Sequence, residues 1–599
     1  MKRTANPVSG PSAGEIDQLV ALSSSGRLAE LENLAGHLSA RYPDSGLIWK
    51  LLGQSRYLQG KDALPALEKA AALLPDDVDA LNNLGIALTD NGQTDDAVAT
   101  CRKALKIRPD DPRVLNTLGN ALSELGQAGA AVAAFRRALQ IKPDYAKAYN
   151  NLGKALDTLG QPDAAVDCFR QALKLNPDYP LAFSALLMMM QYTGTFTNEE
   201  IFSAHKAYAQ RFETPLKRNW QPHSNPRDPA KRLKIGYVSP DFRRHSVAYF
   251  LEPVLARHDP DRFEIYCYYN HARTDEVTRR LQSLADHWRD IRTLSDDDTA
   301  TLIRQDGIDI LVDLAGHTTG NRLPVFCRKP APVQASWLGY PSSTGLSAMD
   351  YRITDIHADP AGMSERYYSE VLYRLPDTTA CFSAADDAPE TVPHPAREQA
   401  GITFGSFNNF SKVNPAVRTL WARILLAVPH SRLMLKDAAF TDAETCRKLV
   451  SEFEALGIAP ERIKLVTRDI SYREHMNRYN QIDIGLDPFP YNGVTTSAEA
   501  MWMGVPVVTL AGNSFGSRMG VSLLSCTGMT ELIAATPEEY VAIASRLAGD
   551  INHLEELRCG LRTRVMNSPL LDARRFTENL EQAYRNMWQA YVNGMAART

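Results

Sequence analysis

The 599-residue sequence has few cysteines and no long apolar run. Its eight cysteines are scattered, none forms a Cys-x-x-Cys pair, and a chain of this length does not need disulfides to fold. We therefore expect reduced, mostly buried cysteines in a cytoplasmic protein. The longest apolar stretch, residues 181–190, is much shorter than the roughly 20 residues that cross a bilayer. These features argue against a secreted disulfide scaffold and a membrane-spanning protein.

The sequence also lacks an excess of one charge. Lys and Arg number 66, Asp and Glu number 70, and no basic block stands out. This balance gives no electrostatic reason to expect binding to nucleic acid or to a membrane surface. Two cations near the start precede no apolar run, which is not the pattern of a signal peptide. The length exceeds what one hydrophobic core supports, so we expect several structural units.

An internal repeat is present in the first third of the chain. A Pro-Asp pair recurs every 34 residues, at Pro75, Pro109, Pro143 and Pro177. Two glycines follow in each of the first three units, at 85 and 92, 119 and 126, and 153 and 160. The first glycine allows close helix approach, and the second makes a left-handed turn between two helices. This period and pattern predict tetratricopeptide repeats over 75–108, 109–142 and 143–176, within a superhelix spanning 13–192.

The first helix of each repeat carries asparagines that we expect on the concave face of the superhelix. An asparagine amide offers both donors and an acceptor, which suits sequence-tolerant binding of an extended peptide backbone. Solvated helix positions with no binding role are the alternative interpretation. The arm indicates protein or peptide partners through these candidates: Asn82, Asn83, Asn116, Asn150 and Asn151.

Beyond a predicted linker at 193–232, short apolar segments alternate with helical ones. This alternation favours parallel, doubly wound sheets of the α/β class. We expect two such lobes, 233–383 and 399–570, separated by a Pro- and charge-rich break at 384–398, and a last helical segment over 571–599. The strand candidates are 233–238, 263–268, 308–313, 334–339, 351–354, 402–407, 432–435, 463–466, 482–486 and 506–510. Ligands of such sheets bind at the carboxyl ends of the strands.

The most informative local motif runs from Asp483 to Pro506. A strand ends at Asp487, a Gly-containing loop follows, and a helix begins at Thr495-Thr496. The free N–H groups and positive dipole of a helix N-terminus, with two hydroxyls, suit a diphosphate. Glu499, one turn into the helix, is placed to accept hydrogen bonds from ribose hydroxyls. A simple N-cap role for Thr495 is the alternative.

At this point the chain resembles the O-GlcNAc transferase/SPINDLY family of glycosyltransferases over nearly its whole length. The resemblance rests on several motifs in the same order behind a tetratricopeptide arm. They are Asp241–Val247, Leu311–Thr318, Arg328–Pro341, Asp350–Asp355, Phe404–Pro415, the Thr495-Thr496 motif and Ala583–Trp588.

The resemblance implies a two-Rossmann (GT-B) transferase that is inverting, metal-independent and acts on Ser or Thr of proteins. Lys412 matches the family lysine that stabilises charge on the leaving diphosphate. His245 matches a histidine near the acceptor, either a general base or a positioning group. The resemblance further implies nucleotide-sugar contacts by Asn409, His475 and Arg478. His317, in a strand-to-loop position facing the cleft, is expected to contact sugar or acceptor. No metal cluster and no cofactor beyond the nucleotide-sugar co-substrate are expected.

Two positions depart from the animal O-GlcNAc transferases. Val494 stands where those proteins usually carry histidine, and Glu499 where they carry aspartate, features nearer the SPINDLY branch. We expect UDP-GlcNAc as donor, with GDP-fucose as the alternative. A non-catalytic scaffold is opposed by retention of Lys412 and His245, and a small-molecule or glycan transferase by the peptide-binding arm. Oligomeric state and acceptor identity stay open.

Overall fold

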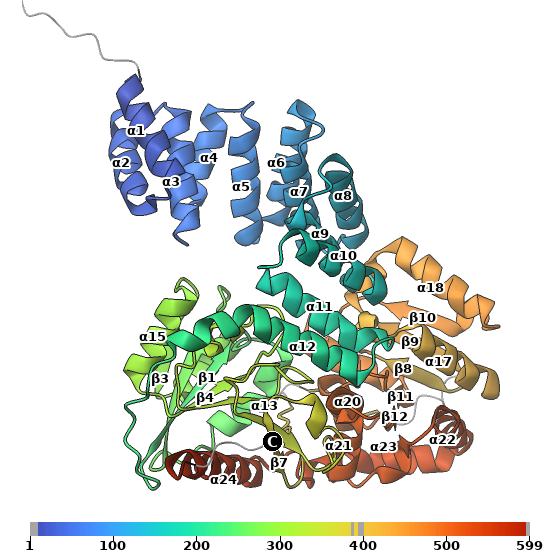
Figure 1. Ribbon diagram of the computed structural model, residues 1–599. Coiled ribbons are helices and arrows are strands. Elements are labelled where there is room, and N and C mark those ends of the chain that lie inside the picture. Colours follow the sequence, from blue (N-terminus) through green and yellow to red (C-terminus); the bar gives the residue numbers. More distant parts are fainter. Residues whose placement is uncertain (1–9, 385–387, 393–400, 595–599) are drawn as a thin grey trace, which may run out of the picture. The chain divides into compact units, whose positions relative to one another are not determined.

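The computed structural model describes residues 10–384, 388–392 and 401–594 (Figure 1). The chain forms two compact units: residues 1–156 with 174–176, and residues 157–173 with 177–599. The boundary lies inside the predicted arm of 13–192, within its last repeat. Helical hairpins therefore continue past the first unit, and those of the second unit pack with the sheets.

The first unit consists of antiparallel helix pairs, which confirms the tetratricopeptide repeats. Gly92 and Gly126 adopt φ of +77° and +74° at the turns within two repeats, the left-handed region expected there. A Cβ at Gly119 would lie 2.5 Å from the ring of Phe135, so the paired helices approach too closely for any side chain. The helices are α1 (Ala13–Ser24), α2 (Leu28–Arg41), α3 (Gly46–Leu58), α4 (Leu64–Leu73), α5 (Val78–Asp90), α6 (Thr94–Ile107), α7 (Pro112–Glu124), α8 (Ala128–Ile141) and α9 (Ala146–Thr158).

The second unit begins with three further helices, α10 (Pro162–Leu175), α11 (Pro180–Thr193) and α12 (Asn198–Phe212). Helix α12 lies within 193–232, the segment expected to be a linker. Thr197 and Glu200 form a capping box at its start, and the helix buries His205 and Tyr208. The Thr-x-x-Glu pattern was the sequence signal for this helix. The short η1 helix (Thr214–Asn219) follows it.

The N-terminal lobe is a seven-stranded parallel sheet in the order β3-β2-β1-β4-β5-β6-β7. Its strands are β1 (Leu233–Ser239), β2 (Phe263–Tyr269), β3 (His287–Asp290), β4 (Ile310–Asp313), β5 (Val333–Ser336), β6 (Tyr351–Asp355) and β7 (Val371–Leu375). Its helices are α13 (Ser246–Leu255), α14 (Glu276–Leu284), α15 (Asp296–Asp306) and α16 (Leu323–Phe326). The edge strands β3 and β7 were not predicted, because neither is a continuous buried run: β3 is polar and partly exposed, and β7 is only partly buried.

The C-terminal lobe is a six-stranded parallel sheet in the order β10-β9-β8-β11-β12-β13. Its strands are β8 (Thr403–Ser406), β9 (Arg432–Lys436), β10 (Ile463–Val466), β11 (Ile484–Leu486), β12 (Val507–Leu510) and β13 (Ile533–Ala534). Its helices are η4 (Phe410–Lys412), α17 (Pro415–Ala427), α18 (Ala443–Ala455), α19 (Tyr472–Arg478), α20 (Thr495–Trp502), α21 (Met519–Cys526), α22 (Pro537–Gly549) and α23 (Ile551–Met566). The predicted break at 384–398 falls mostly outside the described residues.

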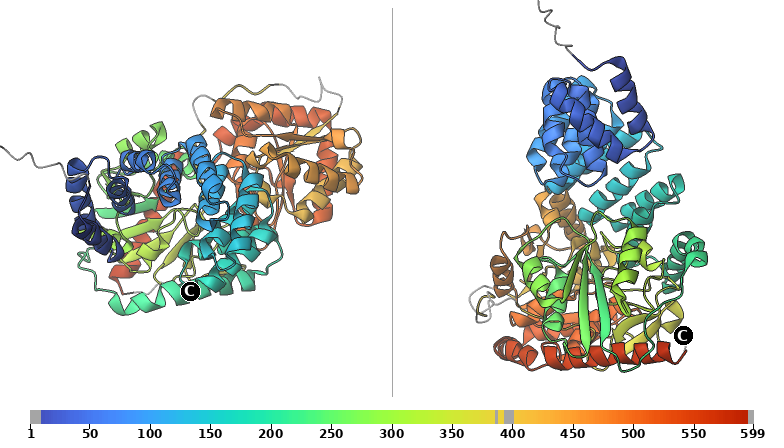
Figure 2. Two further views of the ribbon diagram at one scale, coloured as in Figure 1. Left: turned by 90° about the horizontal axis from the view of Figure 1, so that it is seen from above. Right: turned by 90° about the vertical axis from the view of Figure 1, so that its left-hand side faces the viewer.

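The last helix, α24 (Ala573–Val592), returns to the N-terminal lobe and runs along its base (Figure 2). It buries Phe576, Leu580, Tyr584 and Trp588 in the core of that lobe. The tip of the chain, 595–599, lies outside the described residues. The predicted class, a tetratricopeptide solenoid followed by two Rossmann-like lobes, is therefore confirmed. None of the helices described is long and apolar enough to cross a membrane.

Candidate active site

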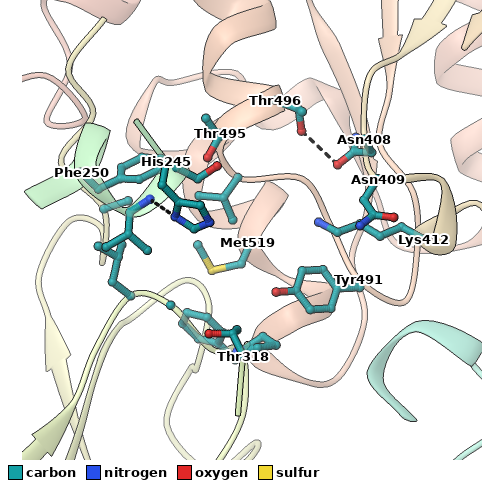
Figure 3. A pocket seen from close by; sticks show the side chains of 18 of the residues that line it. His245, Phe250, Thr318, Asn408, Asn409, Lys412, Tyr491, Thr495, Thr496 and Met519 are labelled. Atoms are coloured by element: carbon teal, nitrogen blue, oxygen red, sulfur yellow. Dashed lines mark hydrogen bonds between the residues drawn. The ribbon is translucent and has the colours of Figure 1, made fainter. Parts of the chain in front are cut away.

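A cavity of about 360 Å³ lies between the two sheet lobes, at the carboxyl ends of their strands (Figure 3). The N-terminal lobe contributes His245, Thr318 and Gly339, and the C-terminal lobe contributes Lys412 and Thr495. The remaining lining residues are Met188, Tyr192, Ser246, Val247, Phe250, Leu338, Pro341, Thr379, Ala380, Asn408, Asn409, Tyr491, Val494, Thr496, Phe515 and Met519. Two facing sheets thus place their strand-end loops around one ligand-sized space.

Lys412 is the cation of this cavity. It ends η4, just after β8, and its Nζ donates to the Asn492 carbonyl oxygen at 2.9 Å. The same Nζ lies 4.1 Å from the centroid of the Tyr491 ring. Burial lowers the pKa of Lys412 to about 8, and the negative charge of Asp487 opposes that shift. The ammonium is held by one carbonyl and one aromatic face, so it keeps donors for an anionic ligand.

The N-terminus of α20 forms another wall of the cavity. Val494 is the N-cap residue and makes no side-chain cap, so the alternative N-cap role of Thr495 is not observed. The Thr496 hydroxyl donates to Asn408 Oδ1 at 2.9 Å, whereas no bond from the Thr495 hydroxyl is found among the described residues. The free N–H groups at this helix end and the Thr495 hydroxyl therefore face the cavity. None of the described residues that line the cavity carries a carboxylate.

His245 lies across the cavity from Lys412 (Figure 3). It is the N-cap of α13, because its Nδ1 accepts from the Val247 N–H at 3.3 Å. Asp241 Oδ1 lies 3.6 Å from the same nitrogen. Burial lowers the pKa of His245, and the charge of Asp241 raises it in opposition. A neutral ring that accepts at Nδ1 carries its proton on Nε2, the nitrogen left for the cavity.

A second cavity of about 350 Å³ adjoins the first in the C-terminal lobe, and Asn409 lines both. His475 lines it and links two charged side chains: its Nδ1 contacts Lys436 Nζ, and its Nε2 lies 2.9 Å from Glu499 Oε2. Asp469 accepts from Lys436 at 2.7 Å and from Arg478 at 2.8 Å. The predicted residues His475, Arg478 and Glu499 thus belong to one network, and Asn409 lines the same cavity.

Two of these residues do not reach either cavity themselves. Glu499 is 3% exposed and its Oε2 also accepts from the Tyr479 hydroxyl at 3.3 Å. Arg478 pairs with Asp469, and Asp469 lines the second cavity. In this arrangement Glu499 orients His475 rather than offering its carboxylate directly to a ribose.

His317, expected to contact sugar or acceptor, lies behind the cavity wall. It is 1% exposed, its Nδ1 lies 3.0 Å from the Ser184 hydroxyl, and its Nε2 lies 3.0 Å from the Thr344 carbonyl oxygen. Its ring packs edge-on against Tyr208. The neighbouring Thr318 lines the cavity instead. A histidine after a strand end turns inward here because α11 and α12 cover that position.

We expect His317→Ala to destabilise the fold by about 2–4 kcal/mol, because two buried polar partners lose their hydrogen bonds and a void remains. Urea unfolding of the second unit measures this loss. Thr318→Ala, at a residue that lines the cavity, should cost less than about 1 kcal/mol. Equal stability of His317→Ala and the parent chain would contradict the structural role.

The five arm asparagines lie on the first helices of consecutive repeats, α5, α7 and α9. Asn82, Asn116 and Asn150 are buried. The Thr117 hydroxyl donates to Asn82 Oδ1 at 2.9 Å, and Asn151 donates to Asn116 Oδ1 at 3.0 Å. Part of their hydrogen-bonding capacity therefore joins neighbouring repeats. Asn83 and Asn151, both partly exposed, are the members with amide surface left for a peptide.

Several lining residues were not singled out from the sequence. Met188 and Tyr192 come from α11, which the repeat period placed in the arm. Lys436 ends β9 and Tyr491 lies in the loop after β11, so the rule that strand ends carry ligands was a usable signal. Among the residues described, no group of three or more His, Cys, Asp or Glu side chains is arranged to hold a metal ion.

This chain is similar to several known proteins. The profile of glycosyl transferase family 41 matches residues 201–394 and 380–580, and tetratricopeptide profiles match 59–121, 119–160 and 146–179. The Petunia hybrida protein called probable UDP-N-acetylglucosamine–peptide N-acetylglucosaminyltransferase SPINDLY is 41% identical over 412 residues, 68% of this chain and 44% of that protein. The Arabidopsis thaliana protein called probable UDP-N-acetylglucosamine–peptide N-acetylglucosaminyltransferase SEC is 34% identical. The match covers 61% of this chain and 38% of that protein. The chain thus spans less than half the length of these relatives.

A solved structure is also similar. A mutant of the Thermobaculum terrenum O-GlcNAc transferase superposes with a TM-score of 0.82 and 39% identity. The match covers 87% of this chain and 98% of that one. The similarity therefore extends over the sheet lobes and into the helical repeats.

Proposed function

Because this chain belongs to glycosyl transferase family 41, we propose that it transfers GlcNAc from UDP-GlcNAc to Ser or Thr hydroxyls of proteins, without a metal and with inversion. The observation that carries this proposal is that Lys412 and the α20 N-terminus of the C-terminal lobe line the same cavity as His245 of the N-terminal lobe, with Lys412 across the cavity from His245. A cation and a helix N-terminus on one cavity suit a diphosphate, and His245 offers a polar group to an acceptor.

The chemistry follows from this arrangement. Cleavage of the sugar–phosphate bond leaves negative charge on the outer phosphate of the nucleoside diphosphate. The Lys412 ammonium, the free N–H groups of α20 and the Thr495 hydroxyl would stabilise that charge as it develops. An acceptor hydroxyl that attacks the anomeric carbon from the His245 side, opposite the leaving phosphate, inverts the configuration. His245, with its Nε2 proton toward the cavity, would orient the acceptor oxygen.

The adjoining cavity beside His475 is suited to the nucleoside, since Asn409 connects it to the diphosphate wall. Aromatic and imidazole rings there, Phe407 and His475 among them, offer faces for a base. GDP-fucose is the second candidate donor, because Val494 and Glu499 are nearer the SPINDLY branch than the animal O-GlcNAc transferases.

Thermal-shift titration with UDP, UDP-GlcNAc, GDP and GDP-fucose tests the proposal. Binding to the folded state raises the melting temperature by mass action. A shift with the uridine pair supports GlcNAc transfer, and labelled acceptor proteins are then the next assay. A shift with the guanosine pair alone would replace the donor by GDP-fucose. No shift with any of the four would favour a non-catalytic scaffold.

We expect Thr495→Val to weaken binding of the accepted nucleoside diphosphate about tenfold, the value of one hydrogen bond to a charged group. The side chain keeps its shape, so folding should be unaffected. Isothermal titration calorimetry measures the affinity. Thr419→Val on the exposed face of α17, far from the cavity, is the matched control. An unchanged affinity for Thr495→Val would remove this hydroxyl from the diphosphate site.

For the arm, we propose that Asn83 and Asn151 contact acceptor proteins. Replacing both by alanine should raise KM for a protein acceptor severalfold and leave hydrolysis of the donor unchanged, because the donor site lies in the other unit. Asn91→Ala, at the C-terminal end of α5, is the control. A parallel fall in donor hydrolysis would indicate misfolding instead of lost acceptor contacts.

A further inference from the structure

The Asp487 carboxylate and the Lys412 ammonium lie on opposite sides of one peptide group. Lys412 Nζ donates to the carbonyl oxygen of Asn492 at 2.9 Å. The N–H of the same peptide, that of Gly493, donates to Asp487 Oδ1 at 2.6 Å. The peptide dipole is therefore aligned between a cation at its oxygen and an anion at its hydrogen, an arrangement in which each bond polarises the other.

Asp487 is completely buried and its remaining bonds fix its orientation. Its Oδ2 accepts from the Thr509 hydroxyl at 2.7 Å, and its main-chain carbonyl accepts from the Tyr540 hydroxyl at 3.0 Å. A Cβ at Gly520 would lie 2.6 Å from Oδ2, so α21 also closes over the carboxylate. A buried carboxylate held this tightly has no solvent to compensate its charge.

Other ionisable groups surround η4, but they serve other contacts. Asp157 accepts from the Ser411 hydroxyl on the far side of η4, and Asp437 caps the turn after β9. Tyr192 packs on the ring of Tyr491 with centroids 5.0 Å apart, and both phenols have pKa values raised by burial. His245 faces Lys412 across the cavity and is held neutral by its lowered pKa. Asp487 is the group whose negative charge acts on Lys412.

We propose that Asp487 is the positioning residue of Lys412: through the Asn492–Gly493 peptide it fixes the place of the ammonium and keeps it charged for the diphosphate. The proposal rests on the function proposed above and adds the residue on which its cation depends. Burial drives Lys412 toward the neutral amine, and it raises the pKa of Asp487 to about 7 even though hydrogen bonds and the Lys412 charge oppose that rise. Each charge therefore favours the ionised form of the other, the carboxylate from full burial and the ammonium from the cavity wall.

The pH dependence follows in sign. Diphosphate binding requires the ammonium, so affinity falls as pH rises through the pKa of Lys412, about 8 in the parent chain. Across one intervening peptide group, and at an effective dielectric constant of about 20, loss of a unit charge changes a pKa by about 1–2 units. Loss of the Asp487 charge therefore moves the alkaline fall of affinity about 1–2 pH units lower. Asp487, with a pKa of about 7, is mostly ionised where this limb begins, and His245 titrates below 6.5, on the acid side of it.

Asp487→Asn is the test substitution, because it removes the charge and keeps the shape. The amide oxygen still accepts from Gly493, and the amide nitrogen can donate to the Thr509 oxygen. Asp483→Asn is the matched control: Asp483 is equally buried just before the start of the same strand and accepts from the Thr403 N–H at 2.7 Å. It differs from Asp487 in lying away from Lys412.

The experiment measures UDP and GDP affinity from pH 6 to 9.5 for the full chain, both variants, Lys412→Met and the Lys412→Met/Asp487→Asn pair. We expect the pH midpoint of the alkaline fall in affinity to be lower in Asp487→Asn and unchanged in Asp483→Asn. Adding Asp487→Asn to Lys412→Met should cause no further shift of the pH dependence. A parent midpoint in Asp487→Asn, or the same shift without Lys412, would overturn the proposal.

A second measurement keeps this inference separate from the proposed function. The carbon-13 resonance of the Lys412 side chain, assigned by its loss in Lys412→Met, reports the titration of the amine without any nucleotide. If the parent chain binds neither UDP nor GDP, the proposed function fails, yet the Asp487→Asn shift of this resonance still supports the pairing. An unshifted resonance refutes the pairing whatever the nucleotides do.

Discussion

Lys412→Met is expected to lower the rate of sugar transfer by about 10²–10³-fold, the usual cost of removing one group that stabilises developing negative charge. Methionine fills a similar volume beside Tyr491, so the cavity wall should remain packed. Stability should fall somewhat, because the buried Asp487 carboxylate loses the cation that opposes its desolvation and must take up a proton. Steady-state transfer to a protein acceptor and thermal unfolding, run side by side, measure the two effects.

The matched control is Lys464→Met on β10, where the lysine is exposed and bonds only to Gln481 among the described residues. It removes the same charge from the same lobe but away from the cavity, and it should leave the rate unchanged. Activity of Lys412→Met within threefold of the parent rate would show that the leaving diphosphate is stabilised elsewhere. The helix N-terminus at Thr495 would then be the group to examine.

His245→Asn should lower kcat by about 10²-fold while the start of α13 stays capped. The asparagine oxygen can accept from the Val247 N–H as Nδ1 does now, so helix stability is retained. What is lost is the Nε2–H that faces the cavity. His245→Gln restores a donor near that position and should recover at least tenfold of the loss, because the neutral ring donates at Nε2 instead of accepting.

A pH profile separates the two roles of His245. The pKa of this histidine is lowered from 6.5, so the neutral ring is present at pH 7 and is lost as pH falls through the lowered value. A donor role predicts no acid limb of kcat from His245, because the imidazolium keeps its Nε2–H, whereas a base role predicts a limb below pH 6.5 that disappears in His245→Gln. If His245→Gln were as inactive as His245→Asn, the ring would be acting as a base and would have to release its Nε2 proton first.

Much of the fold could be predicted because its signals are local. The 34-residue period, the turn glycines and the alternation of apolar strands with helices each reflect backbone geometry that neighbouring residues set. The α12 helix was not predicted, although its Thr197–Glu200 capping box is a local signal. The edge strand β3 was not predicted because it is polar, and an edge strand needs no apolar run. The repeat period also continued into helices that fold with the sheets.

For the site, the sequence by itself determined which chemical groups are available: a lysine after β8, a threonine pair at the start of α20, and a histidine after β1. Only the tertiary structure decided how they are used. It turned His317 inward under α11 and α12, bound Glu499 to His475, and set Asp487 and Lys412 on the two sides of one peptide. The physical reason is that the charge and direction of each side chain depend on its burial and on its partners. Those partners lie tens to hundreds of residues away in the sequence, so local spacing does not encode them.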